Sequence, residues 1–256
     1  TYQNLIIGFG KAGKTLAADL ANHGQSVVLV EQNDQMYGGT CINIGCIPSK
    51  KLLAEGAKHH DFQAAMQAKN TLIPKLRAAN FAKLDVAGAD HPRVHYSTEM
   101  LSLAERPKRL VIIGGGYISL EFAFMYQQFG SKVTILDNSP VFLPREDRDI
   151  AEEMLRVLNS KGIKVLQGVK IEAFRDNTAD TSVITSQGEF TADAVLVGVG
   201  RVPNTQGLGL ANAGIETDPS GFILVDDHLR VQGKNHIWAM GDVAGSPMFT
   251  YCLLYT

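Results

Sequence analysis

The sequence is poor in cysteine, has little excess charge and lacks a long uninterrupted apolar run. Three cysteines among 256 residues are too few for the disulfide framework of a small secreted protein. A formal net charge of -2 gives no electrostatic basis for binding nucleic acid or an anionic membrane. The longest apolar stretch, residues 110–126, contains three glycines and Glu121, which favours a buried strand and helix over a membrane span. We therefore expect a cytoplasmic protein with no nucleic-acid or membrane partner.

Glycine is plentiful, and part of it forms a pattern that occurs twice. A short apolar run ends at Gly8, Gly10 and Gly13, a helical pattern follows, and a second apolar run ends at Glu31. In both copies the middle glycine and the acid are 21 residues apart. The second copy lies 106 residues after the first and consists of Gly114, Gly116, Ser119 and Asp137.

Each part of this pattern suits a dinucleotide. The first glycine permits a tight turn, the second lets a pyrophosphate approach the backbone, and the third lets helix and strand pack closely. The phosphates rest on the helix N-terminus, and the acid accepts hydrogen bonds from a ribose. Ser119 replaces the third glycine, so the second copy is either a site with a small side chain or a decayed repeat. Two matched copies favour two bound dinucleotides.

Two of the cysteines lie in the segment GGTCINIGCIPSK, residues 38–50, soon after the first copy. Cys41 and Cys46 are five positions apart, at the expected start of a helix. A helix N-terminus stabilises a thiolate, and a thiol pair beside a redox cofactor can exchange electrons with it. Two small buried side chains or a soft-metal site are the alternatives. The third cysteine, Cys252, is expected to serve packing or to be incidental.

Four motifs together resemble the flavoprotein disulfide reductases, the family of dihydrolipoamide dehydrogenase, glutathione reductase and mercuric reductase. They are the first glycine pattern, the cysteine segment, GGGYISLE at 114–121, and the pair VGVGRVPN at 197–204 and IWAMGD at 237–242. The sequences of the cysteine segment and of residues 142–150 are most similar to the bacterial branch that includes the reactive-chlorine-resistance, copper-reducing enzyme.

The resemblance implies an α/β fold with two Rossmann-like dinucleotide-binding domains, each a three-layer structure around a parallel sheet. Residues 1–105 and 229–256 would form a shortened, discontinuous FAD-binding domain. Residues 106–228 would form the NAD(P)-binding domain, inserted into the first.

The resemblance also implies roles in a redox centre. Cys46 would face the flavin, and Cys41 would attack the acceptor. Lys50 would lie below the flavin and pair with Glu121, buried beside the nicotinamide. Tyr117 would cover the empty nicotinamide pocket, with simple core packing as the alternative. These four catalytic candidates are Cys41, Cys46, Lys50 and Glu121.

Two sets of binding residues follow from the same resemblance. Asp242 would contact the ribityl or pyrophosphate region of the flavin, with a helix cap as the alternative. No metal ligand is expected. The expected FAD residues are Gly8, Gly10, Gly13, Glu31, Gly39, Thr40, Lys50, Gly241 and Asp242, and the expected nicotinamide-coenzyme residues are Gly114, Gly116, Tyr117, Ser119, Glu121, Asp137 and Gly200.

Asp137 bears on the choice of coenzyme. A carboxylate at the ribose would repel a 2′-phosphate by roughly 4 kcal/mol per charge pair at an effective dielectric constant near 20. The NADP-preferring members of the family place arginines just after this strand, where this chain has Asn138 and Pro144, although Arg145 is near. We expect FAD and NADH, with NADPH as the less favoured coenzyme.

The chain also departs from the family layout. Only 68 residues separate Cys46 from Gly114, several dozen fewer than expected, so part of the FAD domain should be missing. The chain ends 14 residues after Asp242, without the C-terminal domain that mediates dimerisation and supplies a histidine–glutamate pair. We therefore expect a partial chain of a homodimeric protein.

The expected function is that of an FAD-dependent oxidoreductase in cell redox homeostasis. It would pass electrons from NAD(P)H through the flavin to Cys41 and Cys46, and on to a small disulfide, a metal ion or an oxidant. The alternative is a non-catalytic nucleotide-binding remnant or fragment of such an enzyme.

Overall fold

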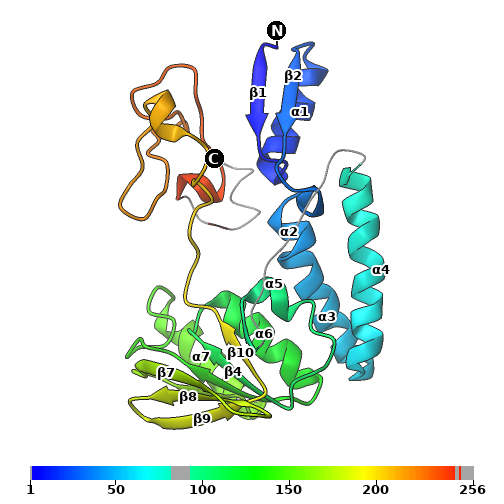
Figure 1. Ribbon diagram of the computed structural model, residues 1–256, viewed down its shortest axis with the longest axis vertical. Coiled ribbons are helices and arrows are strands. Elements are labelled where there is room, and N and C mark those ends of the chain that lie inside the picture. Colours follow the sequence, from blue (N-terminus) through cyan, green and yellow to red (C-terminus); the bar gives the residue numbers. More distant parts are fainter. Residues whose placement is uncertain (1, 82–92, 246–247, 249–256) are drawn as a thin grey trace. The chain divides into compact units, whose positions relative to one another are not determined.

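The computed structural model divides into two compact units, which are described separately (Figure 1). It describes residues 2–81, 93–245 and 248, so Cys252 lies outside the described residues. Of these, unit 1 contains 2–41, 77–81, 201–245 and 248, and unit 2 contains 42–76 and 93–200. Among the described residues, the units assign 42–76, 93–105 and 201–228 differently from the expected domains, whose boundaries stay a prediction.

Unit 1 contains the first glycine pattern as a strand, a helix and a strand. Strands β1 (Asn4–Ile7) and β2 (Val27–Val30) pair in parallel, and helix α1 (Lys11–Asn22) connects them (Figure 1). Parallel neighbours need such a crossover, and a helix is its usual form. A short 3-10 turn, η1 (Asp34–Met36), follows β2, and helix α2 (Thr40–Asn43) begins at the end of this unit.

The later part of unit 1 is mostly irregular. It contains two 3-10 turns, η2 (Leu210–Ala213) and η3 (Asp242–Ala244). Trp238 of the IWAMGD motif makes an isolated bridge to Arg230 and belongs to no strand in the described residues. Three isolated bridges give this region its β character in the described part of the chain.

Unit 2 is built on a five-stranded parallel sheet with the order β3-β10-β4-β5-β6. Helix α6 joins β4 to β5, and helix α7 joins β5 to β6. The bounds of these elements are β3 Val94–His95, β4 Arg109–Ile113, α6 Tyr117–Gln128, β5 Lys132–Leu136, α7 Arg148–Ser160, β6 Lys164–Leu166 and β10 Ala194–Val197.

Both faces of this sheet are covered. Alternate side chains of β4, such as Leu110 and Ile112, pack in one core with residues of α6 and α7, whereas Val111 and Ile113 pack in another with Val183. The second core is closed by an antiparallel sheet of β7 (Ile171–Asp176), β8 (Thr181–Thr185) and β9 (Gly188–Ala192). The strands therefore form continuous apolar runs, as expected where both faces are buried.

Three further helices belong wholly or partly to unit 2: α3 (Cys46–His59), α4 (Phe62–Phe81) and the short α5 (Ser97–Met100). Helix α3 packs against α6. Leu52 of α3 and Ala65 of α4 are fully buried in the main core, so each of these helices buries one face. The predicted α/β class with parallel sheets is confirmed.

Candidate redox and dinucleotide sites

The first phosphate loop has the geometry that its glycines predict. A Cβ at Gly13 would lie closer than 3.0 Å to the carbonyl oxygen of Gly8, so no side chain fits between α1 and β1. At Gly10, which caps α1, a Cβ would meet nothing within 4 Å. The helix N-terminus therefore faces open space, where its N–H groups favour an anion such as a pyrophosphate.

The segment that carries the cysteines packs directly on this loop. The Gly38 N–H donates to the carbonyl oxygen of Phe9 over 3.1 Å. Gly39 has φ +77°, and a Cβ there would lie 2.7 Å from the Cα of Gly10. Only glycine permits this contact, which places Thr40 and the start of α2 next to the phosphate loop.

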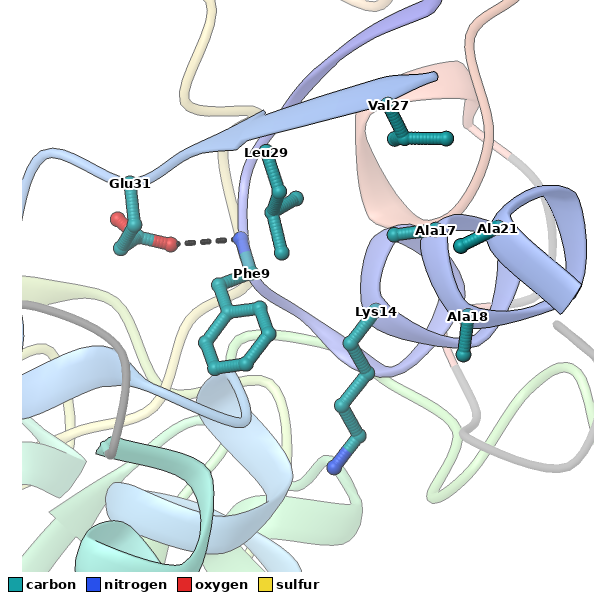
Figure 2. Close-up of a pocket in the computed structure, with 8 residues that line it drawn as sticks. All are labelled: Phe9, Lys14, Ala17, Ala18, Ala21, Val27, Leu29 and Glu31. Atoms are coloured by element: carbon teal, nitrogen blue, oxygen red, sulfur yellow. Dashed lines mark hydrogen bonds between the residues drawn. The ribbon is translucent and has the colours of Figure 1, made fainter. Parts of the chain in front are cut away.

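Glu31 lies at the end of β2, beside a hollow between α1 and β2 (Figure 2). Its Oε2 accepts a hydrogen bond of 2.8 Å from the Phe9 N–H, and its Oε1 accepts one of 2.9 Å from the Gln32 N–H. Oε1 also accepts from the Asn33 N–H over 3.3 Å, so these bonds fix the carboxylate while Oε2 keeps acceptor capacity for a ribose. The hollow has a volume of about 490 Å³ and is lined by Phe9, Lys14, Ala17, Ala18, Ala21, Val27, Leu29 and Glu31.

Asp242 is held by an ion pair. It is the first residue of η3, and the cap position is occupied by Gly241. Its Oδ2 accepts from the guanidinium of Arg201. Sequence reasoning missed Arg201, although this arginine lies in the quoted VGVGRVPN motif.

The two cysteines belong to different units. Cys41 lies in α2 at the end of unit 1, and Cys46 is the first residue of α3 in unit 2, after its cap Gly45. Both are half-buried. Among the described residues no three His, Cys, Asp or Glu side chains gather in a group that could hold a metal ion.

The expected pair of Lys50 and Glu121 is present in unit 2. Lys50 Nζ lies 2.7 Å from Glu121 Oε1, and the Ser49 hydroxyl donates to Glu121 Oε2 over 2.8 Å. The expected burial is wrong, because the side chains are 62% and 38% exposed. The pair lies at the solvent edge of the contact between α3 and α6, not inside it.

The second phosphate loop is open at Gly116, the cap of α6, where a Cβ would meet nothing within 4 Å. A Cβ at Gly115 would lie 2.5 Å from Asp137 Oδ2, so the carboxylate lies directly on the loop backbone. Asp137 is 7% exposed, and its Oδ1 accepts from the Ser139 N–H over 3.3 Å. Sequence reasoning missed Gly115, which the run of three glycines could have indicated.

Ser119, the departure from the glycine pattern, is accommodated by a second glycine. A Cβ at Gly198 would lie closer than 3.0 Å to the Ser119 hydroxyl oxygen, so the glycine after β10 makes room for the serine. Gly200 follows on the same connection. Because β10 runs parallel to β4, this connection leaves the sheet at the carboxyl edge, where the second phosphate loop lies.

Tyr117 is the first residue of α6, and its side chain is 48% exposed, which excludes simple core packing. Its hydroxyl donates a hydrogen bond to Glu146 Oε1. This hydrogen bond, followed by partial burial and the charge of Glu146, raises the pKa of the Tyr117 phenol above its ordinary value. Sequence reasoning did not single out Glu146, which is 29 residues away in the chain.

A sequence model described as pyridine nucleotide-disulphide oxidoreductase matches residues 2–86 and 79–252. The chain belongs to this family. A probable pyridine nucleotide-disulfide oxidoreductase, RclA of Escherichia coli, is 40% identical over 302 residues, which cover 99% of this chain and 68% of RclA. A dihydrolipoyl dehydrogenase of Thermus scotoductus is 30% identical, with 98% and 68% covered, and a mercuric reductase of Staphylococcus aureus is 28% identical, with 99% and 58% covered.

Solved structures give the same picture. The Cu(II) complex of the HOCl-induced flavoprotein disulfide reductase RclA from Escherichia coli matches with a TM-score of 0.93 at 39% identity, over 100% of this chain and 69% of that chain. The match confirms the flavoprotein disulfide reductase fold with Rossmann-like domains. No helix in the described ranges has both the length and the apolar character that crossing a membrane requires.

The comparisons also confirm that the chain is partial. An alignment of 302 positions against 256 residues leaves at least 46 positions of RclA opposite which this chain has no residue. The family model accordingly matches in two stretches that overlap at residues 79–86. The chain spans 68% of RclA and 58% of the mercuric reductase.

Proposed function

We propose that this chain is part of a cytoplasmic, homodimeric flavoprotein that passes electrons from NADH through FAD to Cys41 and Cys46. The observation that carries the proposal is the contact of Gly39 with Gly10, because it ties the cysteine segment to a dinucleotide loop. Cys41 is two residues along the chain from Gly39, and Cys46 is seven. The residues 1–105 with 229–256 would form the FAD domain, and 106–228 the coenzyme domain.

The first site fits FAD. Gly10 leaves the space that a pyrophosphate needs, and Glu31 presents a fixed carboxylate to a ribose. FAD, when bound, would accept the electron pair of the coenzyme and hand it to the cysteine pair. The chain itself would orient the two cysteines, Cys41 in the short helix α2 and Cys46 at the start of the longer helix α3. Lys50, one turn further along α3, would bring a positive charge near Cys46.

The second site fits a nicotinamide coenzyme, and NADH is the one we propose. The Asp137 carboxylate lies against Gly115 of the phosphate loop, where a ribose would meet it. A 2′-phosphate would meet this charge at close range, with Arg145 as the nearest cation along the loop. Equilibrium binding of NADH and NADPH tests this choice, and equal affinity would contradict it.

The acceptor we propose is a small disulfide, a metal ion or an oxidant. One relative is described as a mercuric reductase and another as a dihydrolipoyl dehydrogenase. A third, RclA, has been solved as a Cu(II) complex. Thiol–disulfide exchange or metal binding at Cys41 would both use a thiolate, so the same pair serves either class of acceptor.

The experiment starts from purified protein incubated with FAD and then freed of unbound flavin. Flavin absorbance in the protein, and a long-wavelength band after NADH addition, are the expected results. Cys46→Ser should abolish the band, and Cys41→Ser should preserve or enhance it. Cys252→Ser serves as the matched control with the same chemical change. Equal loss of the band in the first two variants would contradict the assigned roles.

A non-catalytic fragment is the second candidate. The observation that favours it is the small sheet of unit 1, which has two strands in the described residues, together with the positions that the chain lacks relative to RclA. Protein that stays colourless after incubation with FAD would support the fragment and exclude the enzyme for this chain.

A further inference from the structure

The hydrogen bond from the Tyr117 hydroxyl to Glu146, which we call the bridge, connects two loops at one edge of the unit 2 sheet. Tyr117 follows β4 at the start of α6, and Glu146 lies between β5 and α7. Strands β4 and β5 are parallel neighbours, paired from Arg109 with Lys132 to Ile113 with Leu136. Both loops therefore leave the sheet at its carboxyl edge, where ligands of open α/β sheets bind.

The same edge carries the two groups that a dinucleotide would use. Gly116, the open cap of α6, is adjacent to Tyr117 in the chain, and Asp137 follows β5 directly. A ligand with its pyrophosphate at Gly116 and its ribose at Asp137 lies along the ends of β4 and β5. The bridge from Tyr117 to Glu146 joins the connections of these same two strands, so ligand and bridge would meet at this edge of the sheet.

Glu146 is the fixed end of the bridge. Its N–H donates to the Leu143 carbonyl oxygen over 3.0 Å. The Arg148 guanidinium donates to the carbonyl oxygens of Phe142 over 3.0 Å and of Glu146 over 2.9 Å. Phe142 is only 3% exposed and packs in the main core, which anchors the loop. These bonds fix the backbone from which the Glu146 side chain extends, and they do not involve Tyr117.

Tyr117 is the movable end. Its side chain is 48% exposed, and a ring of this kind turns about the Cα–Cβ bond at little steric cost. The hydrogen bond to a carboxylate is the charge-assisted kind, which is stronger than one between neutral groups. The position of the ring is therefore set largely by Glu146.

We propose that Glu146 is a positioning residue that holds Tyr117 across the second dinucleotide site, so that coenzyme binding must break the bridge. We call this hydrogen-bonded pair of Tyr117 and Glu146 the latch. The inference rests on the proposed function, because the latch acts on the proposed coenzyme site. A half-exposed charge-assisted hydrogen bond that has to be broken should weaken binding about three- to tenfold. The latch should lower the affinity of the site for every ligand that has to displace Tyr117.

Calorimetric titration with NAD⁺ and with ADP-ribose tests the proposal without turnover. Glu146→Ala and Tyr117→Phe should each tighten binding about three- to tenfold, and the double variant should gain no more than either single one. Glu146→Gln should give an intermediate affinity, because its amide oxygen still accepts the hydrogen bond without the charge. Glu152→Gln on α7 removes the same charge from an exposed side chain and is the matched control.

The outcomes separate the latch from the function on which it rests. If the unaltered protein binds neither ligand, the coenzyme site itself is refuted. If it binds both and the Glu146 and Tyr117 variants bind equally or more weakly, the latch is refuted. Additive gains in the double variant would also refute it, because two independent effects would then replace one shared bond. Thermal melting of each variant shows whether a weakened affinity comes from loss of the fold.

Discussion

The contact between Ser119 and Gly198 gives a prediction that tests the interpretation of the second glycine pattern. A Cβ at Gly198 would overlap the Ser119 hydroxyl oxygen, whereas its next neighbours, Ile113 O at 3.5 Å and Ser119 Cβ at 3.7 Å, are at ordinary distances. Gly198→Ala should therefore destabilise the protein through this one overlap. Overpacking of a buried site costs about 1–3 kcal/mol.

Ser119→Ala should rescue the alanine at position 198. The Ser119 side chain is 0% exposed, and its hydroxyl has no hydrogen-bond partner among the described residues. Removing this hydroxyl alone should be neutral or stabilising by a few tenths of a kcal/mol, since alanine is also the better helix former. The double variant should return close to the unaltered stability, a coupling of about 1–3 kcal/mol between the two sites.

Urea unfolding followed by far-ultraviolet circular dichroism measures this coupling. The single tryptophan, Trp238, lies in unit 1, so its fluorescence would report on the wrong unit. Gly168→Ala serves as a control for a glycine of unit 2 where a Cβ meets nothing within 4 Å, although its positive φ adds strain there. A neutral Gly198→Ala, or a double variant that loses as much as Gly198→Ala alone, would refute the reasoning.

Three further predictions concern other parts of the chain. Hydrogen bonds from two lysines of α3 lower the pKa of Glu55 to about 2. The carboxylate therefore contributes stability above its unfolded pKa of about 4.3 and loses this contribution as the pH falls toward 2. In Glu55→Gln, the free energy of unfolding in urea should depend less on pH across this window. Gly39→Ala should lower the flavin retained per protein at least several-fold, measured by absorbance after gel filtration, because its φ of +77° and the 2.7 Å approach both exclude a side chain. Glu121→Gln should cost less than about 1 kcal/mol of unfolding free energy in urea, because its ion pair is largely exposed.

The first two of these predictions have matched controls. Glu172→Gln changes the same charge on an exposed strand position and should leave the pH dependence intact. Gly233→Ala has a similar φ of +74° with no atom within 4 Å, so it separates backbone strain from the steric approach at position 39. A loss of about 3–5 kcal/mol in Glu121→Gln would contradict the exposed pair, because that is the cost of breaking a buried one.

The local parts of the site could be predicted from the sequence. The two glycine patterns, their strands and helices, and the acids Glu31 and Asp137 follow from spacing alone, because a strand, a turn and a helix fix one another over some 25 residues. The pairing of Lys50 with Glu121 was predicted from the resemblance, and the structure forms it. The exposure of this pair was not predicted, because it depends on which residues cover the solvent edge of the contact between α3 and α6.

The parts that the sequence did not predict all depend on loops that are distant in the chain. Arg201 pairs with Asp242 across 41 positions, and Glu146 receives the hydrogen bond of Tyr117 across 29. Periodicity identifies the face that an element buries, but it does not tell which loops meet at the end of a sheet. Gly198 is the instructive case, because its role follows only from the neighbouring Ser119.

The two dinucleotide sites differ in how well their strands are covered. In unit 2 the strands are buried on both faces, whereas Leu5 and Ile7 of β1 are each 63% exposed and α1 has no buried residue. Parallel strands are normally covered on both faces. The apolar side chains of β1 therefore fit a strand with packing partners on both faces, and the described residues of unit 1 do not supply all of these partners. RclA has at least 46 aligned positions that this chain lacks. The coenzyme site can therefore form on a complete core, while flavin retention depends on a half-covered one, which makes flavin binding the property that decides between enzyme and fragment.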